Sequence, residues 1–130
     1  LVCRLASRRA GVADETKTIS VTLRAWCDKK KLDLILTCGG TGFGPRDVTP
    51  EATEAVLTRR ASGLTAALVV EGLKHTPLAA LSRGVSGQRK STIIVNLPGS
   101  EKAVREGMAL LSRVLPHAVE MVRGRTTDHC

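Results

Sequence analysis

The sequence predicts an α/β fold in which helices cover both faces of a mostly parallel sheet. Short apolar runs at 32–38 and 91–97 alternate with longer segments whose apolar residues recur at helical spacing. Glycine-containing turns follow both runs directly, as loops do at the carboxyl ends of parallel strands. The length of 130 residues suits one hydrophobic core. We expect the domain to occupy 1–123 and a disordered tail to occupy 124–130.

The first expected helix follows Asp14, whose carboxylate can cap its N-terminus. A weak apolar alternation at 2–9 precedes it and fits a strand. Within the helix, Ile19, Leu23 and Trp26 recur at helical spacing and form one apolar stripe, so the tryptophan is expected in the core. The helix is expected to end at the lysine run that follows, where positive charge suits the helix dipole.

The middle of the chain is expected to form a strand, a glycine loop and two helices. The run 32–38, which reads LDLILTC, fits a strand buried on both faces. Thr49 and Pro50 suit the cap and the first position of a helix that ends before Gly63. A second apolar helix is expected at 64–73.

The last third of the chain is expected to contain one strand and one long helix. The polar segment 82–90 indicates a loop. The β-branched run 91–97 indicates a strand. Ser100 can then cap a final helix that begins at Glu101 and continues beyond Pro116.

The composition favours an anionic ligand and argues against a nucleic-acid partner or a membrane span. The net charge is +8, which favours phosphates or acidic surfaces. The basic residues are scattered, and the aromatic rings that single-stranded nucleic acids stack on are limited to Trp26 and Phe43. No apolar stretch approaches the ~18 residues of a membrane span. Because the cysteines show no metal-ligand spacing and no targeting segment is evident, we expect a cytoplasmic protein without structural zinc.

A glycine-rich turn, Gly39-Gly40-Thr41-Gly42, directly follows the strand expected at 32–38. Glycines adopt positive φ and let backbone amides approach an anion closely. Consecutive N–H groups can form an anion-binding nest. An ordinary tight turn would use the same residues. The pattern is neither the dinucleotide fingerprint nor a P-loop, so spacing alone leaves both interpretations open.

Two acidic residues are candidates for metal or catalytic chemistry. Asp47 lies five residues beyond Gly42. A carboxylate beside a phosphate cradle can share Mg²⁺ with substrate phosphates. It can equally cap a turn or pair with Arg46. Asp14 has a similar ambiguity, and on spacing alone helix capping is its favoured role.

Two further segments carry groups that can grip phosphate. Ser82 and Arg83 begin the polar loop, and Ser91 closes it. An arginine can bind a phosphate in a bidentate manner, although a solvated loop has the same composition. The turn Pro98-Gly99-Ser100 follows the last expected strand, and Ser100 can either bind an anion at the helix N-terminus or simply cap it.

Taken in order, these segments resemble the molybdopterin adenylyltransferases, which include the gephyrin-type G domains. The resemblance lies in LDLILTCGGTGFGPRDVTPEATEAVL and HTPLAALSRGVSGQRKSTIIVNLPGS, and it extends over about 12–122. It implies a three-layer α/β fold and an enzyme of molybdenum-cofactor biosynthesis. That enzyme transfers AMP from Mg-ATP to the terminal phosphate of molybdopterin and releases pyrophosphate.

The resemblance also implies roles for matching residues. Asp14 and Asp47 would be catalytic, and Asp47 would hold Mg²⁺. The substrate-binding positions would be Gly39, Gly40, Thr41, Gly42, Ser82, Arg83, Ser91, Pro98, Gly99 and Ser100. It further implies a homotrimer and a partner domain or protein that inserts molybdate.

Relatives in this family begin with an additional strand and helix that have no counterpart in this sequence. We therefore expect a sheet with an unpaired apolar edge. The alternative function is an inactive chain that keeps only the trimer-forming, scaffolding role of a gephyrin-like protein.

Overall fold

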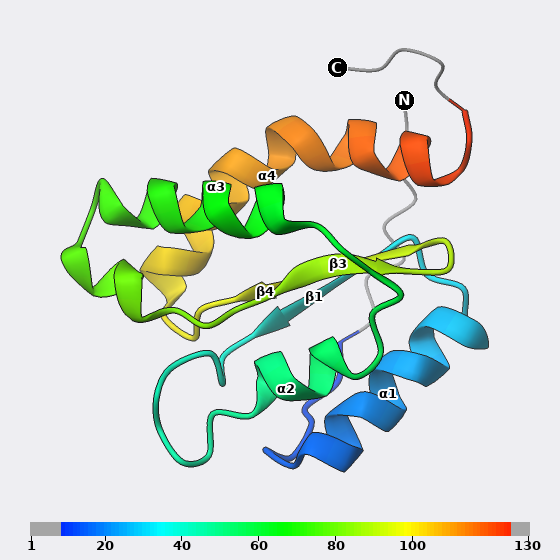
Figure 1. The fold of residues 1–130 in the computed structure, drawn as a ribbon, viewed down its shortest axis with the longest axis horizontal. Coiled ribbons are helices and arrows are strands. Elements are labelled where there is room, and N and C mark those ends of the chain that lie inside the picture. Colours follow the sequence, from blue (N-terminus) through cyan, green and yellow to red (C-terminus); the bar gives the residue numbers. More distant parts are fainter. Residues whose placement is uncertain (1–8, 126–130) are drawn as a thin grey trace.

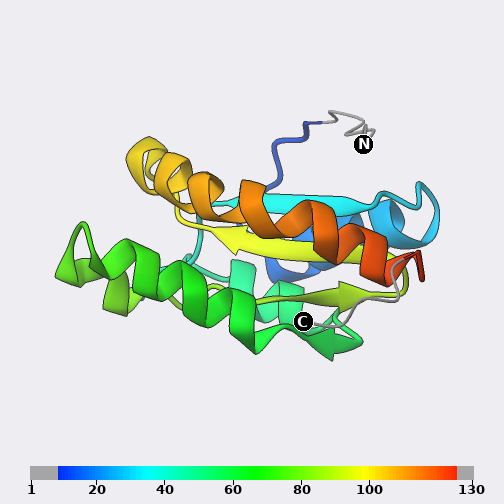
Figure 2. The ribbon, with the colours of Figure 1, turned by 90° about the horizontal axis from the view of Figure 1, so that it is seen from above.

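The computed structural model describes residues 9–125, which form a four-stranded sheet between two layers of helices (Figure 1). The strand order is β1-β4-β3-β2. Figure 2 shows α3 and α4 side by side on one face of the sheet, and α1 and α2 cover the other face. The elements are α1 (Thr16–Asp28), β1 (Leu34–Cys38), α2 (Thr49–Glu54), β2 (Arg59–Arg60), α3 (Ser62–Leu73), the 3-10 helix η1 (Pro77–Leu81), β3 (Ser86–Arg89), β4 (Thr92–Leu97) and α4 (Glu101–Val122).

The α/β class and the helices on both faces are confirmed, and the sheet itself is mixed. β1 and β4 are parallel, whereas β3 pairs antiparallel with both β4 and β2. The prediction of a loop at 82–90 is wrong, because β3 lies within that segment. β3 contains Gly87 and no β-branched residue, so composition carries no strand signal there. A tight turn at Lys90, with φ of 50°, joins β3 to β4.

Each face of the sheet has its own apolar cluster, and β4 contributes alternate side chains to both. Ile94 packs with α1 and α2, where Leu23 and Val56 are buried. Val95 packs with α4, where Leu111 is fully buried. Every residue of β4 is buried, so this strand is the centre of the domain. Trp26 packs against the first cluster as a partly buried residue, as expected.

Three details of the expected elements need correction. Asp14 does not cap α1, because Glu15 occupies the N-cap position, and no side chain of residues 9–125 caps the helix there. Thr49 is likewise inside α2 rather than capping it. β1 is half-buried, with only Ile35 buried, because it pairs with β4 alone within residues 9–125. The expected strand at 2–9 and the expected tail fall almost entirely outside the described residues.

Asn96 is itself buried and joins three elements through side-chain hydrogen bonds. Its amide nitrogen donates to Thr37 Oγ1 at 2.8 Å and to Thr53 Oγ1 at 3.0 Å. Its carbonyl oxygen accepts from the Val85 N–H at 3.1 Å. This side chain therefore fixes β1, α2 and the start of β3 against β4.

We expect Asn96→Leu to lower the free energy of unfolding by about 3 kcal/mol, because it leaves several buried polar groups unpaired. Urea denaturation measures the change. Asn96→Asp is the informative control, since it keeps the acceptor for Val85 and loses both donors. A loss below about 1 kcal/mol for the leucine variant would contradict this role.

An ion pair ties β3 to the end of α1. The guanidinium of Arg89 donates to both carboxylate oxygens of Asp28, at 3.1 and 2.8 Å, and to the Val56 carbonyl at 2.9 Å. Hydrogen bonding by Arg89 lowers the pKa of Asp28 to about 2. Because the pKa is lowered on folding, the pair stabilises the chain above the unfolded value of about 4.

That stabilisation should disappear as the pH falls from about 4 to about 2. We expect Asp28→Asn to be less stable than the natural chain at pH 7, with the difference shrinking across this interval. Urea midpoints at a series of pH values measure it, with Glu54→Gln as a surface control. A difference that persists unchanged to pH 2 would contradict the assignment.

Candidate functional site

Two glycine turns meet at the carboxyl ends of β1 and β4. These strands are parallel and in register from Leu34↔Ile93 to Cys38↔Leu97, so both turns leave the same edge of the sheet. The Gly39 N–H donates to the Leu97 carbonyl at 3.0 Å. A Cβ built on Gly99 would lie 3.4 Å from the Gly39 Cα, so the two turns are in direct contact. The sequence-based expectation that both turns lie together is confirmed.

A cavity of about 550 Å³ opens beside these turns, between the sheet, α3 and α4. Most of the substrate-binding residues expected from the sequence line it. They are Gly40, Thr41, Gly42, Ser82, Pro98, Gly99 and Ser100, and Asp47, expected as the catalytic and metal-binding residue, lines it as well. Apolar residues from α3, η1 and α4, including Leu68, Leu81 and Gly107, also line it. The cavity therefore has one side formed by the turn residues and another suited to an apolar or ring-shaped group.

The backbone of the glycine turn presents consecutive amides. Gly39 and Gly40 have φ of 95° and 68°, in the left-handed region. The carbonyls of Gly40, Thr41 and Gly42 accept hydrogen bonds from Thr49 N at 3.2 Å, Arg83 N at 2.8 Å and Arg83 Nε at 2.7 Å. In a planar trans peptide the following N–H points opposite to the carbonyl.

The amides of Thr41, Gly42 and Phe43 are therefore directed away from the groups that hold the turn. Among residues 9–125, none of these three N–H groups has a hydrogen-bond acceptor. Consecutive amides that point the same way are an anion-binding arrangement.

The N-terminus of α4 supplies a second set of amides to the same cavity. Ser100 caps this 22-residue helix by accepting from the Ala103 N–H at 3.2 Å, so the expected capping role is confirmed. The first N–H groups of a helix lack partners within the helix and carry partial positive charge. Ser100 and Ala103 both line the cavity, so this positive end adjoins it.

Asp47 faces the cavity from a turn that it stabilises itself. Its Oδ2 accepts from the Gly44 N–H at 3.0 Å, and its own N–H donates to the Gly44 carbonyl at 3.0 Å. Thr41 and Asp47 line one cavity, as a shared site requires. Residues 9–125 contain no group of three or more histidine, cysteine or acidic side chains able to hold a metal by themselves.

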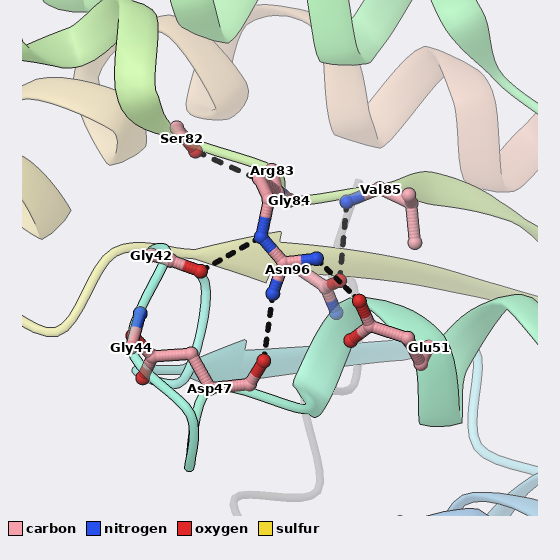
Figure 3. Close-up of polar contacts among 9 residues, drawn as sticks. All are labelled: Gly42, Gly44, Asp47, Glu51, Ser82, Arg83, Gly84, Val85 and Asn96. Atoms are coloured by element: carbon pink, nitrogen blue, oxygen red, sulfur yellow. Dashed lines mark hydrogen bonds and ion pairs between the residues drawn. The ribbon is translucent and has the colours of Figure 1, made fainter.

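Arg83 lies behind the glycine turn and binds protein groups (Figure 3). Its Nη2 donates to the Asp47 carbonyl at 2.6 Å, and its Nη1 pairs with the Glu51 carboxylate in the first turn of α2. The hydrogen bond from Arg83 lowers the pKa of Glu51. The Phe43 ring covers the guanidinium, with 5.9 Å from Cζ to the ring centroid.

Two of the expected site residues lie elsewhere. Ser91 is in the turn between β3 and β4, at the opposite end of β4 from the cavity, ~20 Å along the strand. Asp14 lines a different cavity of about 700 Å³, beside β1, together with Thr37 and Thr49. The structure does not bring either side chain to the turn residues.

Three features of the site have no counterpart among the sequence-based expectations. Glu51 pairs with Arg83, whereas its place at the start of a helix suggests only an interaction with the helix dipole. Glu106, from the second turn of α4, lines the cavity. Ser86 also lines it and is 3% exposed, and its Oγ has no hydrogen-bond partner among the described residues. The sequence carries no signal for Ser86, because its segment has the composition of a loop.

Comparison with known proteins identifies the fold and family that the sequence resemblance implied. The chain is 50% identical over 111 residues to the molybdenum cofactor synthesis protein cinnamon of Drosophila melanogaster. The aligned region covers 85% of this chain and 18% of that protein. It is 40% identical over 113 residues to the molybdopterin adenylyltransferase of Helicobacter pylori strain 26695, covering 87% of this chain and 64% of that protein.

The crystal structure of the molybdopterin biosynthesis enzyme MoaB from Thermus thermophilus superposes with a TM-score of 0.80. It is 51% identical in sequence and covers 88% of this chain and 72% of that one. The chain thus spans less than two thirds of the length of both curated relatives named above. A family model described as a probable molybdopterin binding domain matches residues 5–117. This chain belongs to the family of probable molybdopterin binding domains.

Proposed function

We propose that this chain provides the reaction site of a molybdopterin adenylyltransferase in molybdenum-cofactor biosynthesis. A terminal phosphate oxygen of molybdopterin attacks the α-phosphorus of ATP. The bond between that phosphorus and the bridging oxygen to the β-phosphate breaks, so adenylylated molybdopterin forms and pyrophosphate leaves. The relative named as a molybdopterin adenylyltransferase and the cavity lined by the two glycine turns support this proposal.

The observation that carries the proposal is the pairing of two anion-binding backbones on one cavity. The amides of Thr41 and Gly42, which line the cavity, the next amide along the chain at Phe43 and the N-terminus of α4 would neutralise phosphate charge on both reactants. The apolar wall that includes Leu68 and Leu81 would hold the pterin ring. Holding both reactants in one orientation supplies much of the rate in nucleotidyl transfer.

Asp47 fits a magnesium ion that is held mainly by substrate. One of its carboxylate oxygens is bonded to the Gly44 N–H, and the described residues place no donor on the other. Mg²⁺ commonly binds one or two carboxylates together with substrate phosphates and water. When bound, the ion would neutralise charge on the transferring phosphoryl group. Asp47 would orient it from the rim of the cavity.

The roles of Asp14 and Ser91 remain proposals that rest on the family resemblance. Asp14 lies in the cavity beside β1, so it would act on a part of the ligand that extends around the edge of that strand.

A cytoplasmic location is also part of the proposal, and the free thiols Cys27 and Cys38 suit a reducing compartment. We further propose that a molybdate-inserting partner receives the product. No helix within residues 9–125 combines the length and the apolar character needed to span a bilayer.

One observation supports the alternative role in assembly. α3 is strongly apolar, yet none of its side chains is buried within the described part of the chain. Val70, Leu73, Leu78 and Leu81, from α3 and η1, are 45% to 69% exposed. An apolar surface of this kind favours self-association, and the family resemblance proposes a trimer. Light scattering at micromolar concentration tests it, and a monomer would remove the assembly role.

The enzymatic proposal is tested by pyrophosphate release. The full chain is incubated with molybdopterin, ATP and MgCl₂, and reactions lacking each component serve as controls. We expect pyrophosphate only when all three are present, and adenylylated molybdopterin in equal amount. A folded chain that releases no pyrophosphate under these conditions would overturn the proposal. Release that does not depend on molybdopterin would overturn it as well.

A further inference from the structure

We infer that Arg83 is a positioning residue that holds the glycine turn in its anion-binding form and does not bind ligand phosphate itself. The inference rests on the proposed function only for the identity of the ligand. Its central evidence is where each donor of the guanidinium is directed. This evidence argues against the phosphate-binding role that the residue type suggested for Arg83.

The guanidinium is already occupied by protein acceptors. Nε and Nη2, which form one fork of the group, donate to the carbonyls of Gly42 and Asp47 at 2.7 and 2.6 Å. Nη1 pairs with Glu51, so a carboxylate balances the positive charge. The Phe43 ring covers one face. A phosphate would have to displace these partners, and Arg83 is absent from the described residues that line the cavity.

Arg83 sets the direction of the amides through the carbonyls that it holds. Its backbone N–H binds the Thr41 carbonyl at 2.8 Å, and its Nε binds the Gly42 carbonyl. Because each peptide unit is planar, fixing these two carbonyls fixes the N–H groups of Gly42 and Phe43 on the opposite side. Glycine has little conformational preference of its own, so this turn needs an external constraint to keep one form.

The same guanidinium connects the amides to the carboxylate. By binding the Asp47 carbonyl and the Glu51 side chain, it joins the glycine turn to the turn that carries Asp47 and to α2 (Figure 3). The distance along the chain is large, since Arg83 lies 41 residues from Gly42 and 32 from Glu51. One side chain therefore sets the position of the anion-binding amides relative to the proposed metal-binding group.

The test compares Arg83→Ala, Arg83→Lys and Glu51→Gln with the natural chain. Arg24→Ala is the matched control, because it removes the same charge from an exposed arginine of α1, which donates a 3.3 Å bond to the Ala55 carbonyl. Amide hydrogen exchange is measured by NMR without ligand at Asp47 and Thr49, which are bonded to Gly44 and Gly40. Inorganic pyrophosphate binding is measured by titration. Unchanged exchange in β4 verifies that each variant folds.

We expect Arg83→Ala to speed exchange at Asp47 and Thr49 by about tenfold or more and to weaken pyrophosphate binding. Arg83→Lys should behave like the alanine variant, because a lysine restores charge and not the planar fork. Added guanidinium ion should restore both properties to Arg83→Ala. Glu51→Gln should weaken binding slightly, since it loosens the arginine. Arg24→Ala should match the natural chain.

A phosphate-binding arginine gives the opposite pattern. Lysine would then preserve most of the binding, Glu51→Gln would strengthen it by freeing the guanidinium, and exchange without ligand would stay unchanged in Arg83→Ala. Any of these three results would overturn the inference. The exchange measurement needs no substrate, so the inference can fail while adenylyl transfer is observed, and it can hold in a chain that releases no pyrophosphate from ATP.

Discussion

Replacing Gly40 by alanine should abolish pyrophosphate binding and lower the free energy of unfolding by about 2–4 kcal/mol. Gly40 has φ of 68°, which an alanine adopts only with strain. A Cβ there would also overlap Thr49 Oγ1 and lie 3.2 Å from Thr49 Cβ. Since the Gly40 carbonyl accepts from the Thr49 N–H, relief of the overlap would shift the turn and redirect the Thr41 amide.

The matched control is Gly63→Ala. Gly63 lies in the first turn of α3, and a Cβ there meets nothing within 4 Å. It should leave binding unchanged and raise stability by up to about 1 kcal/mol, because alanine is the better helix former. Adding Thr49→Ala to Gly40→Ala removes the closest overlap and should restore part of the stability. Pyrophosphate binding by Gly40→Ala with the natural affinity would show that this turn is not the anion site.

Asp47→Asn should reduce adenylyl transfer by about 10²–10³-fold and leave the fold intact. The asparagine carbonyl oxygen can still accept from the Gly44 N–H, so the turn that Asp47 stabilises is retained. What is lost is the negative charge available to Mg²⁺. We therefore expect kcat to fall and the Mg²⁺ concentration for half-maximal rate to rise, with pyrophosphate binding in the absence of Mg²⁺ little changed.

Two controls separate this role from a general effect of charge. Glu54→Gln removes an exposed carboxylate paired with Arg60 and should have no effect on rate. Asp14→Asn tests the other proposed catalytic carboxylate, which lines a different cavity. An Asp47→Asn chain with the natural rate and the natural Mg²⁺ dependence would remove Asp47 from the proposed mechanism.

The position of the site was predictable because it follows from strand direction. The apolar runs that form β1 and β4 each lead into a glycine turn, and parallel strands place such turns at one edge. Thr41, Asp47 and Ser100 were therefore predictable as neighbours, and all three line the cavity. Ser91 was predicted because it closes the polar segment that Ser82 and Arg83 begin. The hairpin between β3 and β4 carries it to the far end of the sheet.

The contacts that organise the site were not predictable in the same way. Arg83 binds backbone carbonyls, and every residue has a carbonyl, so composition near Gly42 carries no trace of the contact. Glu51 had a sufficient local explanation at the start of a helix. The exposure of α3 could not be predicted from its sequence either. An apolar helix has the same sequence pattern whether neighbouring elements cover it or not.

The amides of the glycine turn are the centre of the proposed anion site, and an NMR titration of the ¹⁵N-labelled chain with inorganic pyrophosphate tests them directly. We expect the largest shifts at the N–H groups of Thr41, Gly42 and Phe43, followed by those of Glu101 and Lys102 at the start of α4. The cavity beside β1, with Asp14 and Thr37, should stay unaffected. Shifts concentrated in that second cavity, with the turn amides unchanged, would contradict the account.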